Sequence, residues 1–193
     1  MDLGYGNPKA GKWVTNVGLV FTDGPIGSDV MAAEWVYYVS YSPALITVHI
    51  GHGSTPKGKA TLENIRASKE FAVSMASSGQ QSFSSIAGSG DGHAVDMLAV
   101  MKDMGAEFFP AKHVNALHLK GATMHIECKV KDITELGDHY MVVGEVLDIV
   151  TDDSQEPLVY SFGKYHAFGR ALEKPSHEVR DHVSKLKEKH ARK

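Results

Sequence analysis

The alternation of apolar and polar residues from 121 to 131 constrains the fold more than any other feature of the sequence. Five apolar residues occupy every second position: Ala122, Met124, Ile126, Cys128 and Val130. A period of two is that of a β-strand with one buried and one exposed face, as found in antiparallel sheets. The pattern therefore predicts such a strand. It places Cys128 on the buried face, where we expect a small hydrophobic side chain rather than a reactive thiol.

Other segments rich in β-branched and apolar residues also predict strands, and turn residues separate them. The remaining expected strands are Trp13–Thr22, Val30–Tyr41, Ala44–Ile50, Glu70–Ala76, His139–Val150 and Pro157–Phe168. Short helices are expected at 61–68, 80–87 and 94–104, and the segment 108–117 stays unassigned. The sequence shows no repeated βαβ alternation and no internal repeat. The expected fold class is therefore mainly β with short helices, an antiparallel barrel with the helices at one end.

The composition narrows the functional classes. The chain has 193 residues, a net charge of −3 and one cysteine, so it cannot form an intramolecular disulfide and has no basic excess for nucleic-acid binding. No apolar run approaches the roughly 18 residues that cross a bilayer. Residues 1–6 lack the basic and apolar regions of a secretory signal. We therefore expect a cytoplasmic protein with neither nucleic-acid nor membrane partners.

The C-terminal residues 174–193 differ in charge from the rest of the chain. They contain seven Lys or Arg against three Asp or Glu, which leaves about −7 for the remainder. Val179, Val183 and Leu186 follow a helical spacing, and Ser176 can cap the helix. We expect one domain at 1–173 and a basic helical extension at 174–193. A solvated surface helix explains this extension better than a nucleic-acid patch.

The loop Gly53–Ala60 nearly fits the nucleotide-binding pattern G-x-x-x-x-G-K-[ST] between a strand and a helix. Ala60 replaces the hydroxyl residue that binds Mg²⁺, and Pro56 removes one backbone N–H. A nucleotide-binding protein that uses Gly53–Lys59 is therefore a remote alternative. The loop still offers an anion site, with Lys59 beside a helix N-terminus and Thr61 as its expected N-cap. A surface loop with solvated lysines explains the same residues equally well.

The sequence offers no evident metal site or catalytic side chain. The candidate metal ligands are five histidines: His49, His52, His113, His118 and His125. A zinc site needs three or four convergent ligands, and a strand at 44–50 would point His49 away from its apolar face. No G-x-S-x-G nucleophile motif is present. The residues alone therefore predict an anion-binding site on a β-barrel and no further function.

Several segments match one family pattern in order along the chain. Val30–Trp35 and Val39–Leu45 resemble N-V-M-T-A-S-W…V-S-x-D-P-P-L, and Lys59–Ile65 and Ser68–Met75 resemble R-Y-T-x-E-L-I…S-G-E-F-V-V-N-V. Further matches are Val48–Gly51, Gly88–Asp96, Gly121–Cys128, Gly137–His139 and Val143–Val146. The ordered set covers about residues 13–170 and resembles the flavin reductase-like family. This resemblance implies the FMN-binding split-barrel fold, an antiparallel and Greek-key-like barrel.

The resemblance also implies a set of cofactor-binding residues. The flavin ring would lie along Met31, Ala32, Ala33, Glu34 and Trp35. The phosphate would be held by Lys59 and Thr61, with Ser54 and Thr55 in reach, and closed over by Ser89 and Gly90. Tyr165 and His166 are candidates for the nicotinamide side, although ordinary strand packing explains them slightly better.

Two residues depart from the family pattern. Glu34 stands where the pattern has Ser, and Lys59 stands where it has Arg, which keeps the charge but loses bidentate geometry. A carboxylate facing the ring would disfavour an anionic reduced flavin. We therefore expect the Glu34 side chain to point away from the flavin.

The resemblance implies an NAD(P)H-dependent flavin reductase, with FMN as cofactor and NADH or NADPH as co-substrate. The cofactor carries the chemistry, so no catalytic side chain is expected. The family pairs its barrels as homodimers, and an electron-accepting partner protein is a further expectation. A non-catalytic FMN-binding or electron-carrier protein on the same fold is the alternative function.

Overall fold

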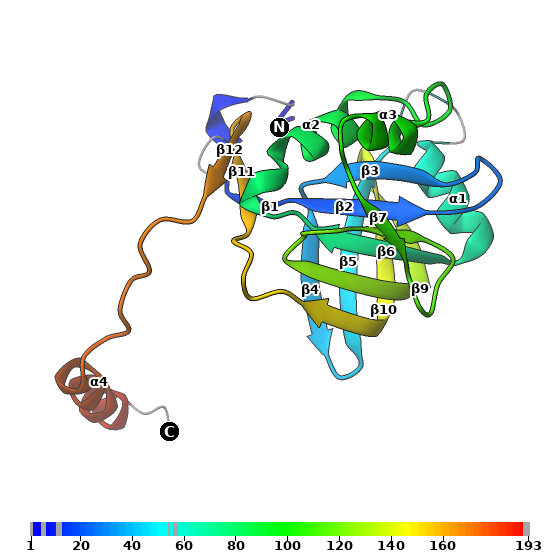
Figure 1. The fold of residues 1–193 in the computed structure, drawn as a ribbon. Coiled ribbons are helices and arrows are strands. Elements are labelled where there is room, and N and C mark those ends of the chain that lie inside the picture. Colours follow the sequence, from blue (N-terminus) through cyan, green and yellow to red (C-terminus); the bar gives the residue numbers. More distant parts are fainter. Residues whose placement is uncertain (1, 5–6, 11–12, 54, 56–57, 191–193) are drawn as a thin grey trace.

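The computed structural model describes residues 2–4, 7–10, 13–53, 55 and 58–190 (Figure 1). The strands in this part of the chain are β1 Thr15–Asn16, β2 Gly18–Thr22, β3 Asp29–Ala33, β4 Val36–Tyr41, β5 Ala44–Gly51, β6 Glu70–Met75, β7 Phe108–Pro110, β8 Leu117–Leu119, β9 Met124–Leu136, β10 His139–Thr151, β11 Leu158–Ser161 and β12 Lys164–Ala167. The helices are α1 Ala60–Ser68, α2 Gln81–Ser89, α3 Met97–Asp103 and α4 His177–Lys189, with 3₁₀ turns η1 Pro8–Ala10 and η2 Ser78–Gln80.

Seven of the strands form one antiparallel sheet in the order β3-β2-β6-β9-β10-β5-β4. The edge strands β3 and β4 follow each other in the chain but stand at opposite ends of this order, and the sheet curls round into a barrel (Figure 1). This arrangement confirms the predicted mainly-β class and the antiparallel split barrel. The strand alternation that predicted a half-buried strand lies in β9, at the middle of the sheet.

The interior of the barrel is a single apolar core. All seven strands and α1 contribute to it: Val20, Met31, Ala33, Val36, Ile46, Val48, Ile50, Leu62, Ile65, Phe71, Val73, Ile126, Cys128 and Val142. Cys128 is fully buried here, as predicted, and burial raises the pKa of its thiol to about 12. The barrel is therefore filled by side chains, and a cofactor must bind outside this core.

A second layer covers the outer face of β2, β3 and β6. The helices α2 and α3 and the β7–β8 hairpin pack there (Figure 1), around Leu19, Phe21 and Met101. Because Val20 faces the barrel interior while its neighbours face this layer, β2 is buried on both sides. The segment Gly18–Thr22 consequently has no polar alternation in its sequence.

Three predicted strands are each divided in two. The segment 13–22 forms β1 and β2, 30–41 forms β3 and β4, and 157–168 forms β11 and β12. The last division needs a tight turn in which Phe162 and Gly163 have φ of 49° and 77°. The residues between β1 and β2 and between β3 and β4 include neither Gly nor Pro, so the sequence carried no turn signal there. The unassigned segment 108–117 contains β7 and the start of β8.

The C-terminal helix α4 stands apart from the barrel at the end of an extended segment (Figure 1). The hydroxyl of Ser176 accepts a hydrogen bond from the backbone N–H of Val179 at 3.4 Å, as expected of its cap. Val179, Val183 and Leu186 are 51%, 42% and 39% exposed. In the described part of the chain, no helix has the length and apolar character needed to cross a bilayer.

Candidate functional site

A cavity of about 230 Å³ lies where the N-terminus of α1 meets β3 and the end of α2. Its walls come from three segments that are distant in sequence: Asp29, Val30, Met31 and Ala32 of β3; Gly53, Gly58, Lys59, Ala60 and Thr61; and Ala87, Gly88, Gly90, Asp91 and Gly92. Five of these residues are glycines, so backbone rather than side chains forms much of the wall. Such a wall allows a ligand to approach main-chain N–H groups closely.

The N-terminal turn of α1 opens onto this cavity. The first helical hydrogen bond runs from Glu63 N–H to the Lys59 carbonyl, so the preceding N–H groups have no helical acceptor. Gly58 has a φ of +89°, and its N–H and carbonyl bond back to Thr55 at 3.0 and 2.6 Å. These contacts direct the loop into the helix start. Together with the positive Lys59 side chain, they make a site for an anion.

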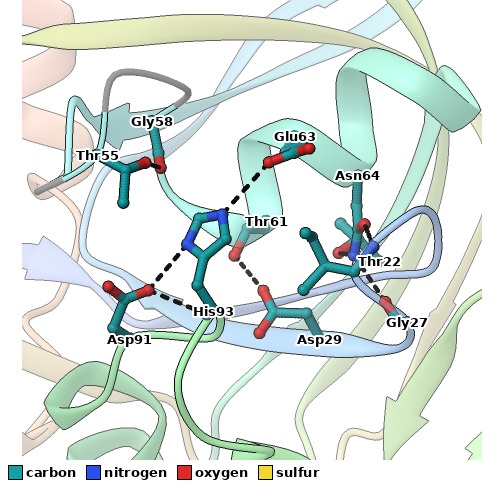
Figure 2. A network of polar contacts seen from close by, with 11 residues as sticks. Thr22, Gly27, Asp29, Thr55, Gly58, Thr61, Glu63, Asn64, Asp91 and His93 are labelled. Atoms are coloured by element: carbon teal, nitrogen blue, oxygen red, sulfur yellow. Dashed lines mark hydrogen bonds and ion pairs between the residues drawn. The ribbon is translucent and has the colours of Figure 1, made fainter.

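Thr61 is not the N-cap of α1, contrary to the prediction. The helix begins at Ala60 with Lys59 as N-cap, and no side chain makes the capping bond there. The Thr61 hydroxyl instead donates to Asp29 Oδ2 at 2.5 Å, inside the protein (Figure 2). Asp29 is 5% exposed, and burial raises the pKa of its carboxyl. Thr61 therefore fixes α1 to β3.

The loop that follows α2 is held to α1 by a histidine bridge. His93 Nδ1 lies 3.0 Å from Asp91 Oδ1, and its Nε2 lies 3.3 Å from Glu63 Oε2 (Figure 2). The loop also packs closely at Gly92, where an added Cβ would lie 2.3 Å from Asp29 Oδ1. The cavity wall at 90–92 is thus positioned from outside by the bridge and from inside by Asp29.

Asn64 anchors the middle of α1 to the turn between β2 and β3. It is fully buried, and its Oδ1 accepts from the Ile26 N–H at 3.1 Å. Its Nδ2 donates to Thr22 Oγ1 at 3.2 Å and to the Gly27 carbonyl at 2.8 Å (Figure 2). One amide side chain therefore fixes the helix relative to the strand that forms the opposite wall of the cavity.

The structure brings five of the residues proposed from the sequence to this cavity: Met31, Ala32, Lys59, Thr61 and Gly90. Ala33 lies in the barrel core instead. The Thr55 hydroxyl bonds to the Gly58 carbonyl within its loop. Ser89 donates to the Ile86 carbonyl at 2.8 Å at the end of α2. Ser54 lies outside the described residues.

Glu34 and Trp35 lie beyond the cavity lining, in the step between β3 and β4. The Trp35 ring lies against His139 and His49, with centroids 4.7 and 6.0 Å apart. Burial raises the pKa of Glu34, and burial and the nearby His139 lower the pKa of His49. The Glu34 side chain therefore stands apart from the cavity lining.

Tyr165 and His166 lie on β12, in the small sheet β1-β11-β12. Tyr165 packs edge-on against Tyr160 and donates to the Ser84 hydroxyl of α2 at 3.2 Å. His166 is exposed. In the single chain these contacts are those of strand packing, and neither residue lines the cavity.

Two of the five candidate ligand histidines lie around one buried serine. His118 Nδ1 and His125 Nδ1 lie 3.3 and 3.2 Å from the buried Ser74 hydroxyl. Burial, with the neighbouring His118, lowers the pKa of His125 to about 4. Across the described residues, no group of three His, Cys, Asp or Glu is placed to hold a metal ion.

The sequence interpretation did not identify Asp29, Asp91, Gly92 or His93 as site residues. Gly92 and His93 belong to a Ser- and Gly-rich stretch that reads as a simple turn. Asp29 opens β3 and becomes part of the site only because α1 packs beside it. The glycine spacing was the one available signal, and it does not say which residues face a cavity.

The fold defines a split-barrel protein with a glycine-lined cavity beside its edge strand β3. Residues 10–169 match the model of the flavin reductase like domain, and the chain belongs to that family. An uncharacterized protein of Pyrococcus abyssi is 35% identical over 120 residues, which are 62% of this chain and 64% of that protein, just under two thirds of its length. The NADH-dependent FAD reductase of Streptomyces globisporus is 26% identical over 160 residues, 77% of this chain and 82% of that protein. The solved structure of flavin reductase PheA2 has 28% identity and a TM-score of 0.70, covering 88% of this chain and all of that one (100%).

Proposed function

We propose that this protein is an NAD(P)H-dependent flavin reductase that binds FMN with its phosphate at the N-terminus of α1. The observation that carries the proposal is the glycine-lined cavity of about 230 Å³, into which the first turn of α1 and Lys59 face. Membership of the flavin reductase family and the similarity to an NADH-dependent FAD reductase support it.

The acidic groups in the cavity wall are compatible with a bound phosphate. Asp29 is held by the Thr61 hydroxyl, and burial raises the pKa of its carboxyl. Asp91 is paired with His93, which offsets its charge. Lys59 and the helix dipole then supply the attraction for the phosphate.

In this proposal, flavin would supply the hydride-accepting chemistry when bound, and the protein would hold its ring against the nicotinamide. The chain contributes Lys59 and the α1 N–H groups to the phosphate. Strand β3 pairs only with β2 in the described sheet, so its outer edge can offer backbone N–H and C=O groups to the polar edge of the ring. Met31 and Ala32 form the wall at that place. No side chain of the chain has to act as a nucleophile.

Anaerobic stopped-flow bleaching of the flavin absorbance tests the reductase function. Purified protein loaded with FMN should be bleached by NADH or by NADPH, and the rates with the two identify the preferred nicotinamide. Dithionite is the control that shows that the bound flavin can be reduced. If dithionite bleaches the bound flavin but neither NADH nor NADPH does, the reductase function is wrong and the electron-carrier function replaces it.

We expect Lys59→Ala to weaken FMN binding by about 1–3 kcal/mol, because a charge-assisted hydrogen bond to the phosphate is lost. Riboflavin has no phosphate and should bind the wild type more weakly than FMN does. Its affinity should be the same for the wild type and for Lys59→Ala. Fluorescence quenching of each flavin gives the dissociation constants. Lys102→Ala, at an exposed position in α3, is the matched control. Equal affinities of the wild type for FMN and riboflavin would contradict the phosphate site.

A homodimer is the proposed assembly. Strand β4 forms an edge of the sheet and carries an apolar surface: Tyr37, Tyr38, Val39 and Tyr41 are 38%, 49%, 53% and 90% exposed. Exposed aromatic residues of this kind are typical of interfaces. Light scattering at micromolar protein concentration should give twice the chain mass, and a monomer mass would contradict the proposal.

A further inference from the structure

Both ring nitrogens of His93 face carboxylates from different segments. Asp91 lies on the same loop and Glu63 lies on α1, with N–O distances of 3.0 and 3.3 Å (Figure 2). The backbone N–H of His93 also donates to Asp91 Oδ1 at 3.0 Å. The side chains of His93 and Glu63 are only 22% and 19% exposed, so this contact is partly shielded from water.

The proton content of the ring decides how many of these bonds form. An imidazolium donates from both nitrogens, whereas a neutral imidazole has one N–H and one acceptor nitrogen. Three acidic groups act on the ring: Asp91 on its own loop, Glu63 on α1 and Asp29 on β3. The hydrogen bond to Asp91, helped by the contact with Glu63, raises the pKa of His93 above its ordinary value of 6.5.

The bridge acts on the cavity through its neighbours. Asp91 and Gly92 line the cavity, and His93 is the next residue along the chain. An ideal Cβ on Gly92 would lie 2.8 Å from the Ala60 Cβ, so the loop lies directly on the first turn of α1. Both ring nitrogens of His93 contact carboxylates. The ring therefore acts by holding the cavity wall in position, and the residues that line the cavity make the contacts with the ligand.

We propose that His93 is a proton-dependent latch that holds the 90–92 loop against α1 and thereby forms the outer wall of the flavin phosphate site. This inference rests on the proposed function for its ligand. It assigns His93 as a positioning residue, and it makes flavin affinity depend on the protonation of a side chain outside the cavity lining.

The direction of the pH dependence follows from the raised pKa. A group whose pKa is raised by folding stabilises the folded arrangement while it is protonated, and this contribution is lost as the pH rises through the raised pKa. The latch is therefore closed below pH 6.5 and opens as the pH rises above that value. Opening also leaves the charges of Asp91 and Glu63 without the imidazolium between them, which further disfavours a phosphate.

The test compares FMN dissociation constants of the wild type and His93→Gln from pH 6 to pH 9. The ratio of the two constants cancels the ionisation of the FMN phosphate. The His93→Gln constant should be about tenfold higher at pH 6, the loss expected for one charged hydrogen bond, and the ratio should approach one at pH 9. His93→Arg stays charged and can bond two carboxylates, so it should bind FMN more tightly than the wild type at pH 9. His177→Gln, on the exposed helix α4, should follow the wild type throughout.

A second measurement reads the latch without flavin. Amide hydrogen exchange in the flavin-free protein should show 88–93 about tenfold better protected in the wild type than in His93→Gln at pH 6, and equally protected at pH 9. A ratio that does not change with pH, in either measurement, overturns the latch. If His93→Gln fails to fold, the comparison of wild type with His93→Arg at pH 9 decides. If hydrogen exchange shows the expected pH dependence but the protein does not bind FMN, the proposed function is overturned and the latch is retained.

Discussion

Replacing Asn64 by alanine should lower the free energy of unfolding by about 3 kcal/mol, the loss of the three hydrogen bonds of one buried amide at roughly 1 kcal/mol each. The side chain is fully buried and bonds to the Ile26 N–H, the Thr22 hydroxyl and the Gly27 carbonyl. Truncation removes the three side-chain hydrogen bonds that link the middle of α1 to the β2–β3 turn, and it leaves the Ile26 N–H and the Gly27 carbonyl without this partner. For a chain of this length the melting temperature should fall by roughly 6–12 °C.

Thermal and urea unfolding, followed by far-ultraviolet circular dichroism, measure this effect. Asn115→Ala is the matched control because that asparagine is exposed on the surface. FMN affinity should fall together with stability in Asn64→Ala, since α1 carries the phosphate site. A change in stability below 1 kcal/mol would mean that water replaces the amide and that α1 is held by its apolar contacts alone.

Replacing Gly92 by alanine should lower FMN affinity at least about tenfold, because the added methyl group displaces the cavity wall. Its Cβ would lie 2.3 Å from Asp29 Oδ1 and 2.8 Å from the Ala60 Cβ. Neither neighbour can move easily: Asp29 is buried and bonded to Thr61, and Ala60 is in the first turn of α1. The loop itself must therefore move outward, away from the phosphate.

FMN titration and thermal unfolding of the same protein separate the two effects of Gly92→Ala. Stability should fall by only about 1–3 kcal/mol, as for other overpacked sites. Gly79→Ala is the matched control, because no atom lies within 4 Å of the Cβ that it would add. If Gly92→Ala folds and binds FMN like the wild type, the cavity is not the flavin site.

The barrel was predictable from sequence because its signals are local. The alternation in β9 and the apolar run of β5 identify a sheet strand whatever the strand packs against. The break between β3 and β4 was missed because Glu34 and Trp35 are not turn residues, and only closure of the barrel requires the chain to leave the sheet there. Strand β2 has no alternation because a second layer buries its other face.

The site was only partly predictable, since it depends on contacts between distant segments. Lys59 was found from its place beside a helix N-terminus and Gly90 from its place in a family pattern, and both line the cavity. Thr61 looked like a cap because its residue type precedes a helix, but Asp29, which is 32 positions away, takes its hydroxyl. The pairing of His93 with Glu63 spans 30 positions and leaves no periodic trace in the sequence.

The buried thiol of Cys128 bears on how this chain tolerates oxidants. Under the proposed function, reduced flavin that escaped its acceptor would pass electrons to oxygen and generate peroxide beside the protein. Peroxide attacks thiolates, and Cys128 is fully buried with a pKa of about 12, so it stays protonated and out of reach. Oxidative damage should instead fall on surface methionines such as Met104, which is 63% exposed and whose sulfoxide is reversible. The chain therefore keeps its single thiol inside the barrel.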